Sequence, residues 1–387
     1  MNKSNHILVL DPIAYAGGSK VATREMLDLL DRKSNHITIL TANPCSWLLR
    51  NVEIVKMSHP NWLPLSEQGK GYWLRQFYFC FWLIYTRIFY GKIHIAVGAS
   101  GPGIDMPIYL MKWLFGYQIT QLIHGPVGLS RSIGLCLCHA EHVFYLKSAF
   151  PSLVAAIKQV WRKESEHIQQ QKQEDLLATH HFDSFVNGIG KKNLPSQCQY
   201  QSPHVFWAAS TLKWKGLDLL LEAINSTPKD QRTPTSICYL TPENNVLPTT
   251  SVPQEIKGIR WYHQPSNLNA LRKSSNIFVS TSHQEPFGLS ILEALIAGMC
   301  VIIPSDGAFW DLVLTHNENC LKYQPNDIKT LQQRIAQAST QPSLLKKLGT
   351  SGAHLAQGYR AEHCYLAITQ AMEKKSHSMI KLNEVKQ

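Results

Sequence analysis

Short apolar runs alternate with longer amphipathic stretches along the first half of the chain. Five of these runs have the length and character of buried strands: residues 6–10, 36–40, 93–97, 119–123 and 142–146. Helical stretches lie between them, one of them from about Lys20 to Leu30, and Phe185 and Val186 form a last short strand. This alternation is typical of a parallel sheet whose strands are joined by crossover helices.

The same alternation restarts after Asn187 and Gly188. A helix is expected from Leu217 to Ile224, and strands are expected at residues 204–208, 236–240, 259–262, 277–280 and 301–303. The sequence therefore predicts two doubly wound α/β sheets, one in a domain of residues 1–186 and one in a domain of residues 187–358. The remainder, residues 359–387, holds a last helix, Glu362 to Met372, and a polar tail from Lys374.

The segment EPFGLSILEALIAGMCVIIPSD contains one charged residue, Glu293, between its flanking acids Glu285 and Asp306. An unpaired ion in so apolar a run would cost several kcal/mol if buried, so Glu293 needs a partner. The pattern predicts a helix that starts near Gly288 to Ser290, with its free amides beside Glu285, which suits a phosphate. The alternative is that Glu293 is half exposed and Glu285 is an ordinary acid beside a helix.

Composition sets the scale of the fold. With 387 residues and 44% hydrophobic content the chain can bury two domain cores, which excludes a small module or a disordered regulator. The nine cysteines are scattered without metal-ligand spacing, which favours a reduced, cytoplasmic setting. The strand-like run HILVLD near the start is too short for a signal peptide, so none is expected.

A net charge of +11 is compatible with nucleic-acid binding. However, the excess of basic residues is spread over both halves of the chain, and the sequence contains no nucleic-acid-binding fingerprint. Residues 68–104 are the exception, with four basic residues, ten aromatic residues and no acid. Only 11 uncharged residues separate Arg75 from Arg87, too few to span a bilayer. This stretch is either a basic, aromatic helix at a membrane interface or a buried helix of the first domain. The two alternatives are compatible if one face of the helix is buried in the domain and the other is apolar and exposed.

The two acids of the apolar segment also carry a resemblance. The run from Glu285 to Leu289, followed by Glu293 and Ala294, resembles the Glu, seven residues, Glu motif of retaining glycosyltransferases, and is most similar to glycosyltransferase family 4. The resemblance implies that Glu285 contacts hydroxyls of a donor sugar and that Glu293 binds the ribose. It also implies that sugar and diphosphate are held by backbone amides of three residues: Phe287, Gly288 and Leu289.

This family has the GT-B fold, in which two Rossmann-like doubly wound domains face a central cleft. The resemblance implies that the first domain binds the acceptor and the second the nucleotide-sugar donor. It also implies that the last helix returns to the first domain. Sites at the carboxyl ends of parallel strands agree with this arrangement.

The segment WAASTLKWKGLDLLLEAI resembles the Lys-Gly motif of the same family, with Lys215 and Gly216 at the matching positions. Lys215 is suited to neutralise a leaving diphosphate, an effect worth ~3 kcal/mol in transition states. The family usually has an Arg about five residues earlier, where this chain has Ser210 and Thr211. Hydroxyl groups there, with Lys213 nearby, are the candidates to replace that Arg at the phosphate.

Gly17 and Gly18 follow the first strand and allow close approach of a ligand to the backbone. The full dinucleotide fingerprint is absent, so a plain turn is the alternative. His124 follows another strand and precedes the open loop Gly125 to Gly128. The resemblance places the glycines near the donor phosphates and His124 beside the donor sugar, whereas a structural role is the alternative for the histidine.

The resemblance implies that the chain is a retaining glycosyltransferase. Because the sequence contains no Asp-x-Asp metal motif, neither a metal nor another cofactor is expected. Its expected substrates are a nucleotide diphosphate sugar and a glycan acceptor, either lipid-linked or a surface-polysaccharide intermediate, at the inner face of the cytoplasmic membrane. Nucleic acid is not expected as a partner. Two alternatives remain: a sugar-nucleotide epimerase of GT-B fold, and an inactive GT-B scaffold of a polysaccharide assembly complex.

Overall fold

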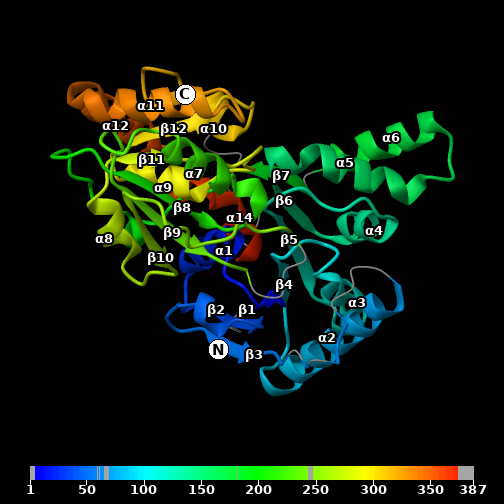
Figure 1. The fold of residues 1–387 in the computed structure, drawn as a ribbon. Coiled ribbons are helices and arrows are strands. Elements are labelled where there is room, and N and C mark those ends of the chain that lie inside the picture. The colour runs from blue at the N-terminus through cyan, green and yellow to red at the C-terminus, as the bar shows by residue number, and fades with distance from the viewer. Residues whose placement is uncertain are drawn as a thin grey trace, which may run out of the picture. The chain divides into compact units, whose positions relative to one another are not determined.

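The computed structural model describes residues 5–58, 60, 62–64, 69–179, 181–242 and 247–373. The chain divides into two compact units, Met1–Gly188 with Ala361–Gln387, and Ile189–Arg360 (Figure 1). The sequence predicts these divisions after Val186 and after Gly358. The expected tail from Lys374, and Gln68 at the start of the aromatic stretch, lie outside the described residues.

The first unit contains a seven-stranded sheet in which every neighbouring pair is parallel, in the order β3-β2-β1-β4-β5-β6-β7. Its strands are β1 (Asn5–Asp11), β2 (Asn35–Thr41), β3 (Glu53–Lys56), β4 (Ile95–Gly98), β5 (Gln118–Ile123), β6 (His142–Leu146) and β7 (Phe182–Phe185). The parallel sheet expected from the alternating apolar runs is thus confirmed, while β3 was not expected.

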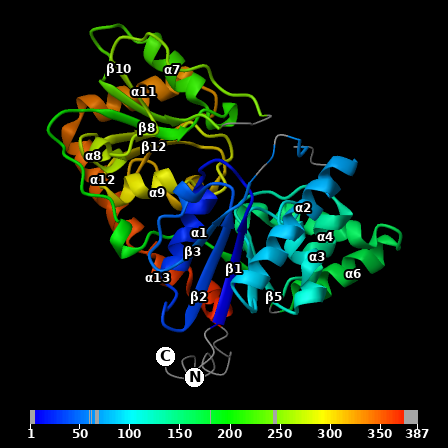
Figure 2. The ribbon, with the colours of Figure 1, turned by 90° about the horizontal axis from the view of Figure 1, so that it is seen from below.

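Helices connect these strands: α1 (Gly18–Asp28), α2 (Gly69–Phe89), α3 (Met106–Phe115), α4 (Arg131–His139), α5 (Phe150–Lys158) and α6 (Glu166–Leu177). Three short 3-10 helices lie in the loops: Pro44–Ser46, Lys147–Ala149 and Gln159–Trp161. Figure 2 shows α2, α3 and α4 side by side, and α2 contacts α3. The buried face of α2, with Phe79 and Leu83, joins the core of this unit.

The chain returns to the first unit at its end. The last expected helix is present as two short helices, α13 (Ala361–Cys364) and α14 (Leu366–Met372). The amide of Asn5 donates to the carbonyl of Met372 at 2.9 Å, and the Gly188 N–H donates to the hydroxyl of Tyr365 at 3.0 Å. Helix α14 also contacts α1.

The second unit contains a six-stranded, entirely parallel sheet in the order β10-β9-β8-β11-β12-β13. Its strands are β8 (Val205–Ser210), β9 (Thr235–Leu240), β10 (Ile259–His263), β11 (Ile277–Val279), β12 (Cys300–Pro304) and β13 (Leu321–Tyr323). Its helices are α7 (Leu217–Asn225), α8 (Leu268–Lys273), α9 (Leu289–Ile296), α10 (Phe309–Val313), α11 (Ile328–Thr340) and α12 (Pro342–Ala356). Two 3-10 helices, Lys191–Asn193 and Lys213–Lys215, complete the unit.

In each sheet the order in which successive strands are added changes direction at the first strand of that sheet. In the first unit β1 lies between β2 and β4, and in the second β8 lies between β9 and β11. At such a switch point the loops that leave the two neighbouring strands turn to opposite faces and open a crevice, where ligands of α/β sheets bind. The loops after β8 and β11 carry most of the residues expected at the donor site.

Candidate functional site

The loop after β8 is fixed in shape by a glycine. Lys213–Lys215 forms a 3-10 turn, and Gly216 follows with φ +69°, in the left-handed region. A Cβ at Gly216 would lie 2.0 Å from the carbonyl oxygen of Thr281, so no side chain fits there. The Thr281 hydroxyl donates to the carbonyl of Lys215 at 2.9 Å, which fastens this loop to the one that follows β11.

The two loops meet in an ion pair. Lys215 Nζ lies 2.5 Å from Glu285 Oε2, and the side chains are only 17% and 15% exposed. The same ammonium lies 4.0 Å from the ring centroid of Trp214, a favourable cation–π distance. Two residues that the sequence analysis assigned to one donor site are therefore in direct contact.

Helix α9 begins beside this pair. Its N-cap is Gly288 with φ +81°, where a Cβ would lie 3.0 Å from Glu285 Cγ. The Ile291 and Leu292 amides donate to the Gly288 carbonyl, and the amides before them have no acceptor inside the helix. The helix start expected at Gly288 to Ser290 is confirmed. Its free amides and positive dipole end make it a favourable place for an anion.

Phe287 has a structural side chain. It is buried and packs in an aromatic cluster with Phe309, Trp310 and Tyr359, its ring centroid 4.8 Å from that of Phe309. Trp310 Nε1 donates to the Gly288 carbonyl at 3.3 Å. The cluster therefore supports the turn before α9 and leaves the backbone of Phe287 as its only means of binding a ligand.

Glu293 has the partner that its apolar surroundings require. Arg272 of α8 places Nη2 2.5 Å from Glu293 Oε2, and the arginine side chain is 3% exposed while that of Glu293 is 27% exposed. Arg272 also donates to the side chain of Asn269. The apolar sequence around Glu293 predicts a partner but does not identify it as Arg272. Its buried guanidinium fixes one carboxylate oxygen while part of the Glu293 side chain faces solvent.

The residues at the position of the family's usual Arg bring no free positive charge to the site. Lys213 Nζ pairs with Asp218 at 2.9 Å, and both side chains are about half exposed. Ser210 ends β8, and Thr211 is fully buried, with an Oγ1 that has no hydrogen-bond partner among the described residues. A phosphate role for these three residues stays a prediction.

A small hollow lies next to Glu285, lined by Ser280, Ser282, Asp306 and Trp310 among others. At its rim Lys322 Nζ lies 2.7 Å from Asp311 Oδ1, and the Gly307 amide donates to Asp311 Oδ2 at 2.8 Å. Partial burial alone would raise the pKa of Asp311, but the hydrogen bonds from Lys322 and the Gly307 amide outweigh it and lower the pKa. The Asp311 carboxylate is therefore held in place at this hollow, with its charge compensated by Lys322.

In the first unit, Gly17 precedes α1 with an extended backbone, φ −158° and ψ 165°. Any residue adopts this conformation, and the nearest atom to a Cβ there would be Ser19 Oγ at 4.0 Å. Neither backbone strain nor crowding explains why Gly17 lacks a side chain. Close approach of a ligand to Gly17 and Gly18 stays a prediction that the open backbone allows.

His124 follows β5 and contacts α1, because its Nε2 lies 3.3 Å from Thr23 Oγ1. Its ring meets Phe185 edge-on, at a centroid distance of 5.7 Å. Nδ1 is buried with no partner among the described residues, and burial lowers the pKa of His124 to about 4. The imidazole is therefore neutral at neutral pH and offers hydrogen bonds rather than charge.

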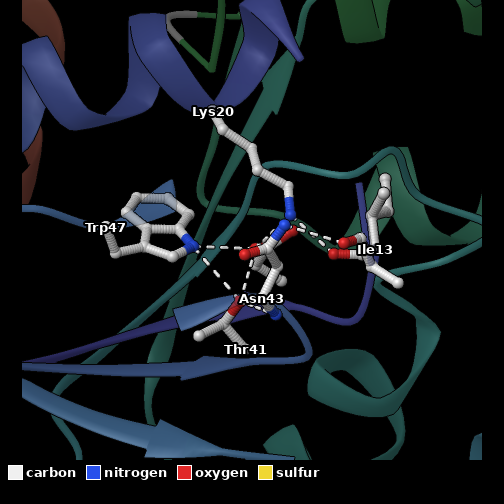
Figure 3. A network of polar contacts seen from close by, with 7 residues as sticks. Ile13, Lys20, Thr41, Asn43 and Trp47 are labelled. Atoms are coloured by element: carbon white, nitrogen blue, oxygen red, sulfur yellow. Dashed lines mark hydrogen bonds and ion pairs between the residues drawn. The ribbon is translucent and has the colours of Figure 1, made fainter. Parts of the chain in front are cut away.

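A buried polar network that the sequence analysis missed supports the loop between β1 and α1 (Figure 3). Asp11 Oδ2 lies 2.9 Å from Lys20 Nζ, and it accepts hydrogen bonds from Thr41 Oγ1 at 2.7 Å and Trp47 Nε1 at 2.8 Å. Lys20 also donates to the Ile13 carbonyl at 2.5 Å. The network thus holds the backbone that leads to Gly17.

A second buried acid supports the loop after β4. Asp105 is fully buried, and its Oδ2 accepts from the Ser100 amide at 3.0 Å and from Gln121 Nε2 at 2.8 Å. Desolvation raises the pKa of Asp105 to about 8 despite these hydrogen bonds. Asp105 is therefore mostly protonated at neutral pH.

Comparison with known proteins locates one family match in the second unit. Residues 200–354 match the family described as glycosyl transferases group 1. An uncharacterized glycosyltransferase of Methanocaldococcus jannaschii is 24% identical over 215 residues, which are 55% of this chain. The match spans 58% of that relative's own length.

Solved structures resemble the whole chain. Sucrose-phosphate synthase from Thermosynechococcus elongatus has a TM-score of 0.69 at 14% identity and covers 96% of this chain and 99% of its own. Anabaena HepE, solved with UDP and glucose, has a TM-score of 0.66 at 12% identity and covers 96% and 100%. At these identities the likeness shows the fold, which is the GT-B fold of two Rossmann-like domains.

Proposed function

We propose that this protein is a glycosyltransferase that binds a nucleoside diphosphate sugar at the carboxyl edge of the second sheet. The observation that carries the proposal is the Lys215 and Glu285 pair beside the first amides of α9. A cation and free amides suit a diphosphate, and a carboxylate next to them suits sugar hydroxyls. The family match at residues 200–354 includes both residues.

Each group has a place in donor binding. Lys215 and the amides of Gly288 and Leu289 bind the diphosphate, and Glu285 binds hydroxyls of the sugar. Glu293, oriented by Arg272, accepts hydrogen bonds from the ribose hydroxyls. Because the similar Anabaena protein was solved with UDP-glucose, UDP-sugars are the first donors to test.

The proposed reaction retains the configuration of the sugar and uses no metal. The bond from the anomeric carbon to the diphosphate oxygen breaks while a bond to the acceptor oxygen forms on the same face. The acceptor proton passes to the departing diphosphate oxygen, and Lys215 stabilises the negative charge that develops there, an effect of ~3 kcal/mol. A lipid-linked or surface-polysaccharide intermediate is the proposed acceptor, bound by the first unit.

The test is product analysis with UDP-sugars and a lipid extract as acceptor pool, monitored by mass spectrometry. Transfer by the wild type, reduced about 100-fold or more in Lys215→Met and in Glu285→Gln, supports the proposal. Lys257→Met, an exposed lysine of the same unit, is the matched control and keeps full activity. Conversion of the sugar nucleotide without an acceptor would favour the epimerase, and donor binding without turnover would favour the scaffold.

A further inference from the structure

Helix α2 exposes a continuous stripe of large apolar side chains. Its members are between 39% and 69% exposed: Trp73, Leu74, Phe77, Phe81, Tyr85, Ile88 and Phe89. Intervals of three or four residues separate Trp73, Phe77, Phe81, Tyr85 and Ile88, which places these side chains on one helix face. The opposite face is buried, and it is through that face that α2 packs on the core of the unit.

The neighbouring helix α3 adds to this surface. Trp113 is 93% exposed, Leu114 62% and Leu110 37%, while Ile108 and Met111 of the same helix are buried. Single exposed apolar residues are ordinary, but ten on two helices in contact are not. We call the exposed apolar residues of α2 and α3 the apolar band.

Charge on these helices has one sign. Their charged residues are Lys70, Arg75, Arg87 and Lys112, with Lys92 just after α2, and neither helix contains an acid. Lys112 pairs with Glu141 at 2.6 Å, so its charge is compensated. Lys70 and Lys92 are exposed. The apolar band is therefore accompanied by a positive excess.

We propose that the apolar band docks the protein on the surface of an anionic lipid bilayer. Aromatic side chains prefer the headgroup level, and basic side chains are attracted to anionic lipids. In the part of the chain that the structure describes, no helix is both long and apolar enough to cross a membrane. Since the other face of α2 is occupied by the protein core, α2 lies in the plane of the interface.

The apolar band identifies a lipid bilayer as a partner of this protein. Only the connection between this bilayer and a lipid-linked acceptor rests on the proposed function. Docking would hold the first unit where such an acceptor is found. The docking itself depends on the apolar band and its charge alone, so it can be tested without substrate.

The test is co-sedimentation of the full chain with vesicles of phosphatidylcholine, with and without phosphatidylglycerol. The wild type is expected to sediment with the anionic vesicles and to be released by salt. The double variant Phe81→Ser/Trp113→Ser is expected to bind them about tenfold more weakly or worse. Leu48→Ser/Leu312→Ser removes two apolar residues of similar exposure, 80% and 78%, outside the apolar band and should bind as the wild type does.

Three results would overturn the proposal: a wild type that stays in solution with anionic vesicles, a double variant that binds like the wild type, or equal binding to neutral vesicles. A wild-type dimer in sedimentation velocity that the double variant abolishes would instead assign the apolar band to a contact between copies. UDP binding is measured on the same samples. A variant that keeps UDP binding and loses vesicles separates failure of docking from failure of the donor site.

Discussion

Gly216 shows how a single residue shapes the site. Its positive φ disfavours any side chain, and a Cβ would collide with the Thr281 carbonyl at 2.0 Å. We expect Gly216→Ala to lower the free energy of unfolding by about 3 kcal/mol or more, measured by urea denaturation. Gly116 has a similar φ of +66° but nothing within 4 Å, so Gly116→Ala should cost only about 1 kcal/mol. Equal losses in both variants would contradict the steric explanation.

Asp105 makes stability depend on pH. Its pKa of about 8 in the folded state is above the ordinary value of about 3.9, so the folded state keeps a proton that the unfolded state releases between these limits. This difference in bound protons does not affect the free energy of unfolding below about pH 4, and it lowers that free energy progressively as the pH rises toward 8. Asn mimics the neutral acid and cannot titrate. We therefore expect the stability of Asp105→Asn relative to wild type to increase with pH over this window.

The size of this effect follows from linkage. Because the folded state binds up to one proton more than the unfolded state, the free energy of unfolding changes by up to about 1.4 kcal/mol per pH unit. Urea denaturation of both proteins at several values between pH 4 and pH 8 measures it. A stability difference that stays constant with pH would show that Asp105 is ionised in the folded protein.

At the scale of elements, the contact between Lys20 and Asp11 joins α1 to the end of β1. Both side chains are nearly inaccessible, so removal of one leaves the other buried without a counter-charge. We expect Lys20→Met to lower the free energy of unfolding by about 3–5 kcal/mol. The double variant Asp11→Asn/Lys20→Met should recover part of this loss, because no charge is then left unpaired. Additive losses in a denaturant double-mutant cycle would contradict this coupling.

Most strands were predictable because their apolar runs are buried on both faces. Strand β3 was missed, since only Val55 of its four residues is buried. A helix between β4 and β5 follows from the alternation, but its bounds could not be given, because α3 follows the loop-like sequence GPGID and has Pro107 in its first turn. The last helix was expected as one piece but divides at Tyr365, a fully buried residue bonded to Gly188.

Pairings within the site were less predictable than its residues. Alternation identifies strands but not their order, and only the adjacency of β8 and β11 brings Lys215 to Glu285. A burial argument required a partner for Glu293, yet no spacing in the sequence points to Arg272. The network of Asp11 and Lys20 was likewise invisible, because it is closed by Thr41 and Trp47 of the next strand and loop.

At the scale of the whole molecule, both ends of the chain build the first unit and the second unit is inserted between them. Ile368 and Met372 of α14 are fully buried within the first unit. The candidate donor residues Lys215, Glu285 and Glu293 all belong to the second unit, and their partners do too. In the proposed function, donor recognition is therefore a property of the second unit.

The most direct test of that central claim is calorimetric titration of UDP, GDP and ADP into wild type, Glu293→Ala and the exposed control Glu222→Ala. We predict that one nucleotide binds wild type and control equally, and binds Glu293→Ala about tenfold or more weakly because ribose hydrogen bonds are lost. If none of the three bound wild type at millimolar concentration, or if Glu293→Ala bound as tightly as wild type, the donor site proposed here would be wrong.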